Sequence, residues 1–235
     1  TISFRQLAQG IKQVAHGLVS RGFAKGDVLA IYSPNTPTYP IAFHGVAHAG
    51  GVVTTVNPTY LVSDLASQLR DSGARFIITA GPFTNNALQA AEEVGGIDEI
   101  FSFDGSPGTT PFSQLMETEE LSTGANIDPD KDLLALPYSS GTTGISKGVM
   151  LTHRNLVANM AQLNGCEELC RPLTERDTLI AVLPFFHIYG LTVIMNYALS
   201  KGASTVVLPQ FDLEQFLAAI QEYGVTFAHL VPPIL

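Results

Sequence analysis

Two kinds of hydrophobic periodicity alternate along this 235-residue chain, and the alternation limits the folds that the chain can adopt. Apolar residues recur at helical spacing from Phe4 to Leu18, after Ser3 and with Gln6 placed for a capping box. A short apolar run of strand length follows at residues 28–32. The strand-like runs lack a regular polar alternation, so both faces of the sheet should be buried. We therefore predict an α/β fold with mostly parallel sheets flanked by helices.

The first part of the sequence keeps this alternation up to residue 103. Thr36 is expected to cap a second helix that begins at Pro37, because proline is favoured at the first helical position. Residues 104–131 are rich in Gly, Pro, Ser, Thr and acidic residues and are interpreted as a connecting segment with one helical patch. The expected helices are 4–18, 37–49, 63–73, 86–94 and the patch 112–117, and the expected strands are 28–32, 52–56, 76–79 and 97–103.

The alternation resumes after the connecting segment, which indicates a second α/β unit. Thr152 and Asp212 are placed to cap helices, and Gly224 is placed to end the second of these. We therefore predict a first α/β subdomain over 1–131, connecting segment included, and a second, incomplete one over 132–235. The expected strands are 133–138, 149–151, 178–183, 205–208 and 225–230, and the expected helices are 153–163, 188–199 and 213–223.

The charge balance excludes some partners. The chain has 12 Lys and Arg against 21 Asp and Glu, a net charge of −9. Non-specific nucleic-acid binders and polybasic membrane anchors need the opposite sign, so we expect no nucleic-acid partner. Two cysteines, Cys166 and Cys170, cannot form a disulfide framework, and no further His or Cys stands close by to complete a zinc set.

The ends of the chain and the length of its apolar stretches indicate where in the cell the protein is expected. The longest apolar stretches are far shorter than the about 20 residues of a membrane span, so we predict no transmembrane segment. No signal peptide is visible, and we expect a cytoplasmic protein, with an organellar signal before Thr1 left open. The chain starts at Thr1 rather than Met and stops at Leu235 just after an apolar run. We expect it to be a piece of a longer protein.

One segment, from Tyr138 to Val149, has the composition of an anion-binding loop. It contains five Ser and Thr residues, three glycines and Lys147, between two strand-like runs. Glycine lets a backbone approach a ligand closely, and consecutive amides can form a nest for an anion. The hydroxyls and the lysine ammonium add donors to phosphate oxygens. A flexible linker would share this composition but would not need a lysine between buried strands. The pattern therefore favours a polyphosphate site.

Two other motifs compete for the same residues. The Walker A pattern fails, because Gly148 and not Ser or Thr follows Lys147. Residues 144–148 do match the Gly-x-Ser-x-Gly nucleophile elbow, with Ser146 as the nucleophile. Asp212 and His229 even follow in the order of an α/β serine hydrolase. An elbow, however, needs a strand running into its first glycine and a helix leaving the last, and the surrounding sequence supplies neither.

Residues 138–153 read Tyr-Ser-Ser-Gly-Thr-Thr-Gly-Ile-Ser-Lys-Gly-Val-Met-Leu-Thr-His. This sequence resembles the signature loop of the adenylate-forming enzymes, which include acyl-CoA synthetases, 4-coumarate–CoA ligases and beetle luciferases. Leu-Pro is usual where Ile-Ser stands here. A second block, residues 183–191, reads Leu-Pro-Phe-Phe-His-Ile-Tyr-Gly-Leu and resembles the 4-coumarate–CoA ligase branch. Residues 32–35, 57–58 and 231–234 also fit the family, so the resemblance covers the whole chain.

The resemblance implies the N-terminal domain of such an enzyme, with layered sheets, and a role for each matching residue. Lys147 and His187 are the expected catalytic residues. His187, with Tyr189 and Phe186, is expected to form the acyl pocket, where the histidine would orient or hydrogen-bond the carboxylate. The expected ATP-binding residues are Ser139, Ser140, Gly141, Thr142, Thr143, Gly144 and Lys147. No residue of this chain is expected to bind a metal.

The implied reaction has two steps: a carboxylate attacks the α-phosphate of ATP, and a thiol, usually CoA, then displaces AMP. The family's Tyr-Gly-x-Thr-Glu block, ribose-binding Asp, hinge and C-terminal catalytic Lys do not occur here. We expect these, and the Mg²⁺ ligand, beyond Leu235, and we expect this chain alone to be inactive. Gln210 replaces a lysine that helps to bind CoA in 4-coumarate–CoA ligases, and Val193 is apolar where plant relatives carry a small polar residue.

Several functions stay open at this point. The leading hypothesis is an acid–CoA ligase, acting on an aromatic propenoate such as coumarate or on a fatty acid. The same fold could serve a luciferase-like or carrier-loading enzyme. An α/β serine hydrolase and a non-catalytic nucleotide-binding remnant are the alternatives from other classes. The oligomeric state is not predicted.

Overall fold

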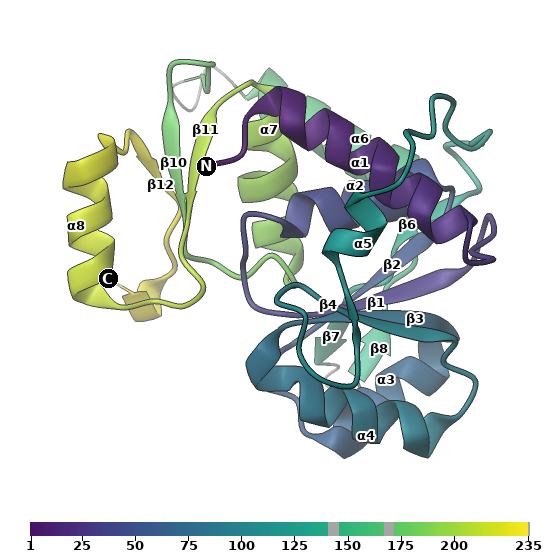
Figure 1. Ribbon diagram of the computed structural model, residues 1–235. Helices are drawn as coiled ribbons and strands as arrows, with labels where there is room; N and C mark the ends of the chain where they lie inside the picture. The colour runs from purple at the N-terminus through teal and green to yellow at the C-terminus, as the bar shows by residue number, and fades with distance from the viewer. Residues whose placement is uncertain (141–145, 167–171, 235) are drawn as a thin grey trace. The chain divides into compact units, whose positions relative to one another are not determined.

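The computed structural model describes residues 1–140, 146–166 and 172–234 and consists of two compact units (Figure 1). The first unit contains Thr1–Ser33 and Thr38–His153. The second contains Pro34–Pro37 and Arg154–Leu235. Each unit has its own mostly parallel sheet with helices packed against it, so the predicted α/β fold is confirmed.

The sheet of the first unit contains, among the described residues, seven strands in the order β5-β4-β3-β1-β2-β6-β9. All neighbouring pairs are parallel except β6 with β9. The central strands β1 and β2 pair from Val28 with Val52 to Tyr32 with Val56, and each is buried over most of its length. The strands are β1 Val28–Tyr32, β2 Val52–Val56, β3 Ala74–Thr79, β4 Glu99–Ser102, β5 Thr110–Pro111, β6 Leu133–Ala135 and β9 Leu151–Thr152.

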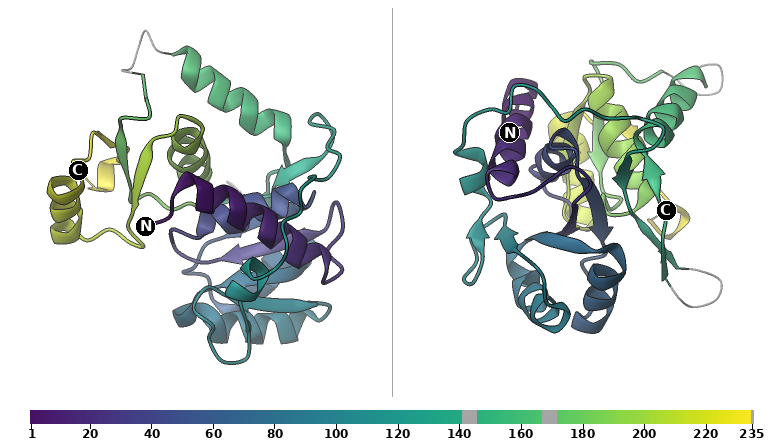
Figure 2. Two further views of the ribbon diagram at one scale, coloured as in Figure 1. Left: turned by 45° about the horizontal axis from the view of Figure 1, so that its top comes forward. Right: turned by 90° about the vertical axis from the view of Figure 1, so that its right-hand side faces the viewer.

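Helices cover both faces of this sheet. Helices α1 (Phe4–Val19), α2 (Tyr39–His48) and α5 (Ser113–Met116) lie on one face, and α3 (Val62–Ser72) and α4 (Thr84–Val94) lie on the other (Figures 1 and 2). A 3₁₀ turn, η1 (Gly81–Phe83), precedes α4. The core under α3 and α4 consists of the buried residues Ala30, Tyr32, Val56, Leu65, Ala66, Leu69, Ala74, Ile77, Ala87 and Ala90. Burial on both faces explains why the strands are continuously apolar.

Helix ends follow local signals where the signals are strong. The Ser3 side chain accepts from the Gln6 amide at 3.3 Å, and the Gln6 side chain accepts from the Ser3 amide at 2.8 Å, so the predicted capping box is confirmed. The predicted start of the second helix is wrong, because α2 has Thr38 as its N-cap and Pro40 in its first turn. Residues 34–37 lie outside the helix and belong to the second unit.

The units divide at a different place from the sequence prediction. Strand β6 pairs with β2 and with β9, so residues 133–152 complete the first sheet instead of opening a second one. The division therefore falls after His153 and not at 131. The segment 104–131 stays within the first unit, where the Leu121 amide donates to Lys12 O at 3.1 Å and the Ala125 amide to His48 O at 3.0 Å.

The second unit contains, in its described part, a parallel three-stranded sheet in the order β11-β10-β12. Helices α7 and α8 lie on opposite sides of these strands (Figure 1). The predicted helix 188–199 is a π-helix followed by a short α-helix, and the predicted strand 225–230 has only two residues. The elements are α6 His153–Gly165, β10 Thr178–Ala181, the π-helix Gly190–Tyr197, α7 Ala198–Ser200, β11 Ser204–Val207, α8 Leu213–Tyr223, β12 Phe227–Ala228 and a 3₁₀ turn Pro232–Ile234.

Helix α8 has the boundaries that its caps predict. Asp212 accepts from the Gln215 amide at 2.9 Å, and Gly224 closes the helix in the left-handed conformation with φ of 59°. Buried Leu173, Leu179, Ala198 and Ala203 form a small core in this unit. In the described residues, every helix is too short or too polar to cross a bilayer.

Candidate functional site

The predicted phosphate loop forms an antiparallel hairpin in the first unit. Strand β7 (Tyr138–Ser140) pairs with β8 (Ser146–Gly148), with Ser139 opposite Lys147. Cross-strand partners in an antiparallel pair project from the same face, so the hydroxyl and the ammonium belong to one surface. Both residues are exposed. The structure therefore brings Ser139 and Lys147 together, with Ser140 next to them on β7.

Gly141, Thr142, Thr143 and Gly144 lie outside the described residues. The glycine at the other end of the motif leaves little space for a side chain. A Cβ on Gly148 would lie 3.0 Å from Cζ of Tyr138, its partner across the hairpin. The Val149 amide donates to Pro137 O at 2.8 Å just beyond this pair. The base of the hairpin is thus closely packed.

The hairpin excludes the nucleophile elbow. Ser146 opens strand β8 and donates to Ser139 O at 3.2 Å, whereas an elbow serine lies on a turn from a strand into a helix. The two expected partners are also engaged elsewhere. Asp212 caps α8, and the ring of His229 contacts Tyr189. The local geometry that a serine hydrolase requires is absent at Ser146.

The second motif lies in the second unit, between β10 and the π-helix, and Asn35 holds its backbone. The Asn35 side chain is 3% exposed. Its Nδ2 donates to Leu183 O at 3.0 Å and Ala181 O at 3.3 Å, and its Oδ1 accepts from the Phe185 amide at 2.7 Å. Sequence reasoning used Asn35 only as part of a family match. Its hydrogen bonds show that it orders the segment that leads to Phe186 and His187.

Tyr189 stands at the centre of this segment. Its amide donates to His187 Nδ1 at 3.3 Å, so the two predicted pocket residues are adjacent. His187 and Tyr189 are exposed, and Phe186 is half-buried. Next to them, Gly190 opens the π-helix, and a Cβ there would lie 2.1 Å from Pro184 O. Only glycine permits this close approach, and π-helical turns are frequent at functional sites.

His229 joins this group, although the sequence pattern linked it only with the serine-hydrolase alternative. Its Nδ1 lies 3.2 Å from Tyr189 Oη, and the two rings meet edge to face at 5.9 Å. Burial lowers the pKa of His229, which favours a neutral imidazole whose Nδ1 can accept a hydrogen bond from the Tyr189 hydroxyl. No spacing pattern links the two residues, because they are 40 positions apart and meet only when β12 pairs with β10.

A profile of the family described as "AMP-binding enzyme" matches residues 1–235. The chain belongs to this family. The finding confirms the resemblance to adenylate-forming enzymes that the hairpin motif indicated.

Two individual proteins are similar to this chain over its whole length. 4-coumarate–CoA ligase 1 of Petroselinum crispum is 36% identical over 236 residues, which cover 100% of this chain and 43% of the relative. 4-coumarate–CoA ligase of Pinus taeda is 38% identical over 240 residues, which cover 100% of this chain and 44% of the relative. The chain thus spans less than half of the length of these relatives.

Solved structures of two similar proteins share the fold. The long-chain-fatty-acid–CoA ligase FadD1 of Archaeoglobus fulgidus has a TM-score of 0.89 and 28% identity, covering 99% of this chain and 45% of that one. ATP-bound MatB of Rhodopseudomonas palustris has a TM-score of 0.85 and 29% identity, covering 99% and 44%.

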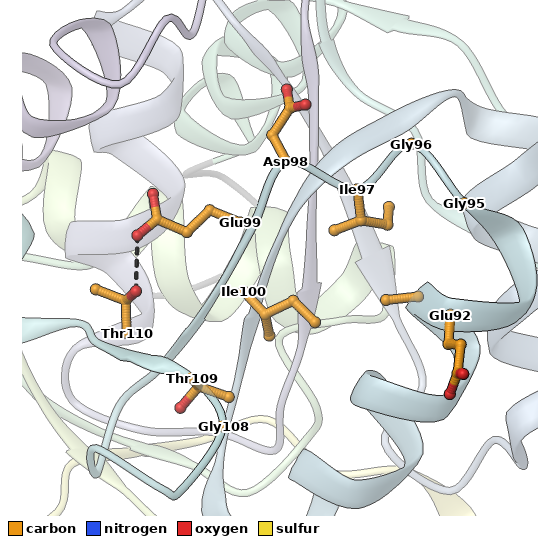
Figure 3. A pocket seen from close by; sticks show the side chains of 11 residues that line it. Glu92, Gly95, Gly96, Ile97, Asp98, Glu99, Ile100, Gly108, Thr109 and Thr110 are labelled. Atoms are coloured by element: carbon orange, nitrogen blue, oxygen red, sulfur yellow. Dashed lines mark hydrogen bonds between the residues drawn. The ribbon is translucent and has the colours of Figure 1, made fainter.

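A pocket of about 640 Å³ lies elsewhere in the first unit of this family member, between the end of α4, strand β4 and the loop before β5 (Figure 3). Two of its three carboxylates, those of Asp98 and Glu99, are paired. Asp98 contacts Arg75 at 2.5 Å, and Glu99 contacts Arg21 at 3.2 Å and accepts from Thr110 at 2.7 Å. No residue that the sequence predicts for the site lines it. Its acidic lining would repel a polyphosphate, so we assign it no part in ATP binding.

Two half-buried histidines are expected to make the stability of this chain sensitive to acid. Burial lowers the pKa of His153 in the first unit and of His229 in the second below the ordinary value of 6.5. At acidic pH these histidines then bind protons more tightly in the unfolded chain than in the folded chain. Their contribution to the free energy of unfolding is therefore complete above about pH 6.5 and is lost as the pH falls below that value.

We expect the melting temperature to fall between pH 7.5 and 5.5, and to fall less in His153→Gln and in His229→Gln. Thermal unfolding at both pH values measures this difference. An equal drop in the wild type and in both variants would contradict the assignment.

Proposed function

We propose that the intact protein is an ATP-dependent acid–thiol ligase that joins a carboxylic acid to CoA through an acyl-adenylate. The single observation that carries the proposal is the Ser139–Lys147 hairpin in a chain of the AMP-binding enzyme family. The relatives named 4-coumarate–CoA ligase and long-chain-fatty-acid–CoA ligase support the reaction class.

In the first step, a carboxylate oxygen of the acid attacks the α-phosphorus of ATP, and the bond to pyrophosphate breaks. Both reactants are anions, so the protein must offset their repulsion. Lys147 is exposed on β8. Among the described residues it forms no ion pair, whereas Lys25 pairs with Asp132 and Lys131 pairs with Asp128. Its charge is therefore available to the β- and γ-phosphates.

The remaining ATP contacts in the proposal come from the same motif. Ser139 is exposed beside Lys147, and its hydroxyl is a donor for a phosphate oxygen. Ser140, Gly141, Thr142, Thr143 and Gly144 share this proposed role through their place in the motif. The crystal structure of MatB with ATP bound supports nucleotide binding by this fold.

Mg²⁺, when bound, would reduce the charge of the triphosphate. In the described part of the chain, no three His, Cys, Asp or Glu side chains gather as a metal site. Among the described residues we therefore name no Mg²⁺ ligand, and the proposal routes no step through the metal.

In the second step, the CoA sulfur attacks the acyl carbon, and AMP leaves with the bonding electrons. We propose that His187, Tyr189 and Phe186 line the acyl side of the reaction. His187 and Tyr189 are exposed and adjacent, so they can offer an imidazole and a hydroxyl to a carboxylate or its adenylate. Val193 lies half-buried in the π-helix nearby in sequence, which favours an apolar acyl group.

The test is ATP–pyrophosphate exchange by the intact protein with a panel of acids, covering aromatic propenoates and medium- and long-chain fatty acids. We expect exchange that depends on one class of acid, followed by CoA thioester formation. Exchange without thioester formation would favour a luciferase-like or carrier-loading enzyme. Absence of exchange with every acid would favour a non-catalytic nucleotide-binding protein and overturn the proposal.

A further expectation concerns the 235-residue chain alone. We expect it to form no acyl-AMP, because the family's Tyr-Gly-x-Thr-Glu block and C-terminal catalytic lysine do not occur in its sequence. Mass spectrometry of acyl-AMP, with the intact protein as positive control and circular dichroism to check folding, measures this. Detectable acyl-AMP from the folded 235-residue chain would contradict it.

A further inference from the structure

The base of the β7–β8 hairpin is attached to helix α3, on the side of the sheet where α3 and α4 lie (Figure 1). Tyr138 Oη donates a hydrogen bond of 2.5 Å to Oδ2 of Asp71. The two residues are 67 positions apart, and Tyr138 is the first residue of β7. The contact therefore joins the start of the hairpin to an element that no motif connects with phosphate binding.

The position of Asp71 is unfavourable for the helix itself. It stands next to Ser72, the last residue of α3, which Gly73 then ends. The carbonyl end of a helix carries partial negative charge and disfavours a carboxylate there. Tyr138 offsets this cost, since a hydroxyl that donates to an ionised carboxylate makes a strong hydrogen bond. Burial and the Asp71 carboxylate raise the pKa of Tyr138, so it remains a donor at neutral pH.

A second connection from α3 reaches the same piece of chain. Gln68, one turn before Asp71, is 3% exposed, and its Nε2 donates to Thr54 Oγ1 at 2.9 Å. Thr54 Oγ1 in turn donates to Leu136 O at 3.0 Å. Helix α3 thus holds the chain both at residue 136 and at Tyr138, immediately before the strand that pairs with Lys147.

The register of the hairpin places Lys147 close to this attachment. Tyr138 pairs with Gly148, and the adjacent Ser139 pairs with Lys147. The Tyr138 ring also contacts the space where a Gly148 side chain would be. The bond from Tyr138 to Asp71 is therefore placed to restrain the base of the hairpin, one residue from Lys147.

We propose that Asp71 is a positioning residue for phosphate binding: through its hydrogen bond to Tyr138 it holds the β7–β8 hairpin in the orientation that presents Ser139 and Lys147 to ATP. The inference rests on the proposed function for its effect on ATP. The attachment itself is a property of the fold and is measured separately.

The kinetic test uses Asp71→Ala, Asp71→Asn and Tyr138→Phe in the intact protein. We expect Asp71→Ala and Tyr138→Phe each to raise KM for ATP about tenfold, the value of one hydrogen bond to a charged group. KM for the carboxylic acid should not change. Asp71→Asn keeps an acceptor oxygen and should recover part of the loss. The double variant should be no worse than either single variant, since both remove the same bond.

The matched control is Asp64→Ala on the same helix. Asp64 accepts from the Leu61 amide at 3.3 Å at the first turn of α3, far along the helix from Asp71. This variant should lower stability without changing KM for ATP. A similar rise of KM for ATP in Asp64→Ala would show that loosening α3 is sufficient, and it would overturn a specific role of Asp71.

Amide hydrogen exchange measures the attachment of the hairpin to α3 independently of enzyme activity. We expect the β7 and β8 amides and the Val149 amide to exchange about tenfold faster in Asp71→Ala and Tyr138→Phe, with β1 and β2 unchanged. Unchanged hairpin exchange overturns the inference even if the enzyme is active. If the wild type catalyses no ATP–pyrophosphate exchange, the proposed function fails, and amide hydrogen exchange still decides whether Asp71 holds the hairpin.

In an active enzyme, faster amide hydrogen exchange of the hairpin with an unaltered KM for ATP would also overturn the inference.

Discussion

Replacing Lys147 with alanine is expected to lower carboxylate-dependent ATP–pyrophosphate exchange by the intact protein about 100- to 1,000-fold, the usual cost of removing one preorganised charge-stabilising donor. The lysine opposes the negative charge of the phosphates in the transition state, where the nucleophile is also an anion. Lys147→Arg keeps the charge but changes its shape, so it should retain more activity than alanine without reaching the wild type.

Lys131→Ala is the matched control, because that lysine belongs to the same unit and its side chain is 82% exposed. It should leave exchange activity unchanged. Full activity of Lys147→Ala would show that the hairpin does not bind the phosphates. Loss of activity in both variants would point to a general effect of charge and not to a site.

Replacing Asn35 with alanine is expected to destabilise the fold by about 2–4 kcal/mol, because three backbone groups each lose a hydrogen bond in a buried place. The Phe185 amide and the Leu183 carbonyl would lose their bonds to the side chain, and the Ala181 carbonyl would keep its bond from the Leu208 amide. Thermal unfolding gives the loss of stability, and faster exchange of the Phe185 amide locates it. Because this segment carries His187, activity should fall at temperatures where the variant is still folded.

Asn35→Asp separates packing from hydrogen bonding. The carboxylate keeps the acceptor for the Phe185 amide but places negative charge beside two carbonyl oxygens. Its instability should lessen at low pH, where a protonated Asp regains one donor. Asn85→Ala, at an exposed position of α4, is the control and should change stability by less than about 0.5 kcal/mol. A change at Asn35 no larger than this would refute its role.

Elements with strong local signals were predicted closely. Strands 28–32 and 52–56 have the observed boundaries, and α8 ends at the predicted glycine. These features depend on short-range sterics, on side-chain periodicity and on caps that bond within three residues. The start of α2 was missed because Thr36 and Pro37 also form a good cap signal, and contacts of residues 34–37 with distant residues decide between the two.

The candidate site divides in the same way. The motif with Ser139 and Lys147 is contiguous, so a family resemblance could identify it, and the profile match confirms the family. The contacts of Asp71, Asn35 and His229 were not predicted, because their partners lie 67, 150 and 40 positions away. A single sequence contains no signal for a contact between two such positions.

The sequence by itself determined the α/β class, most of the elements and the phosphate-loop motif, since each depends on neighbouring residues and on a contiguous pattern. Only the tertiary structure decided that β6 and β9 belong to the first sheet, that Tyr138 hydrogen-bonds Asp71, and that His229 meets Tyr189. Strand order and side-chain pairing result from the burial of one surface against another, and many pairings satisfy the same local pattern. The complete packing of the chain selects one of them.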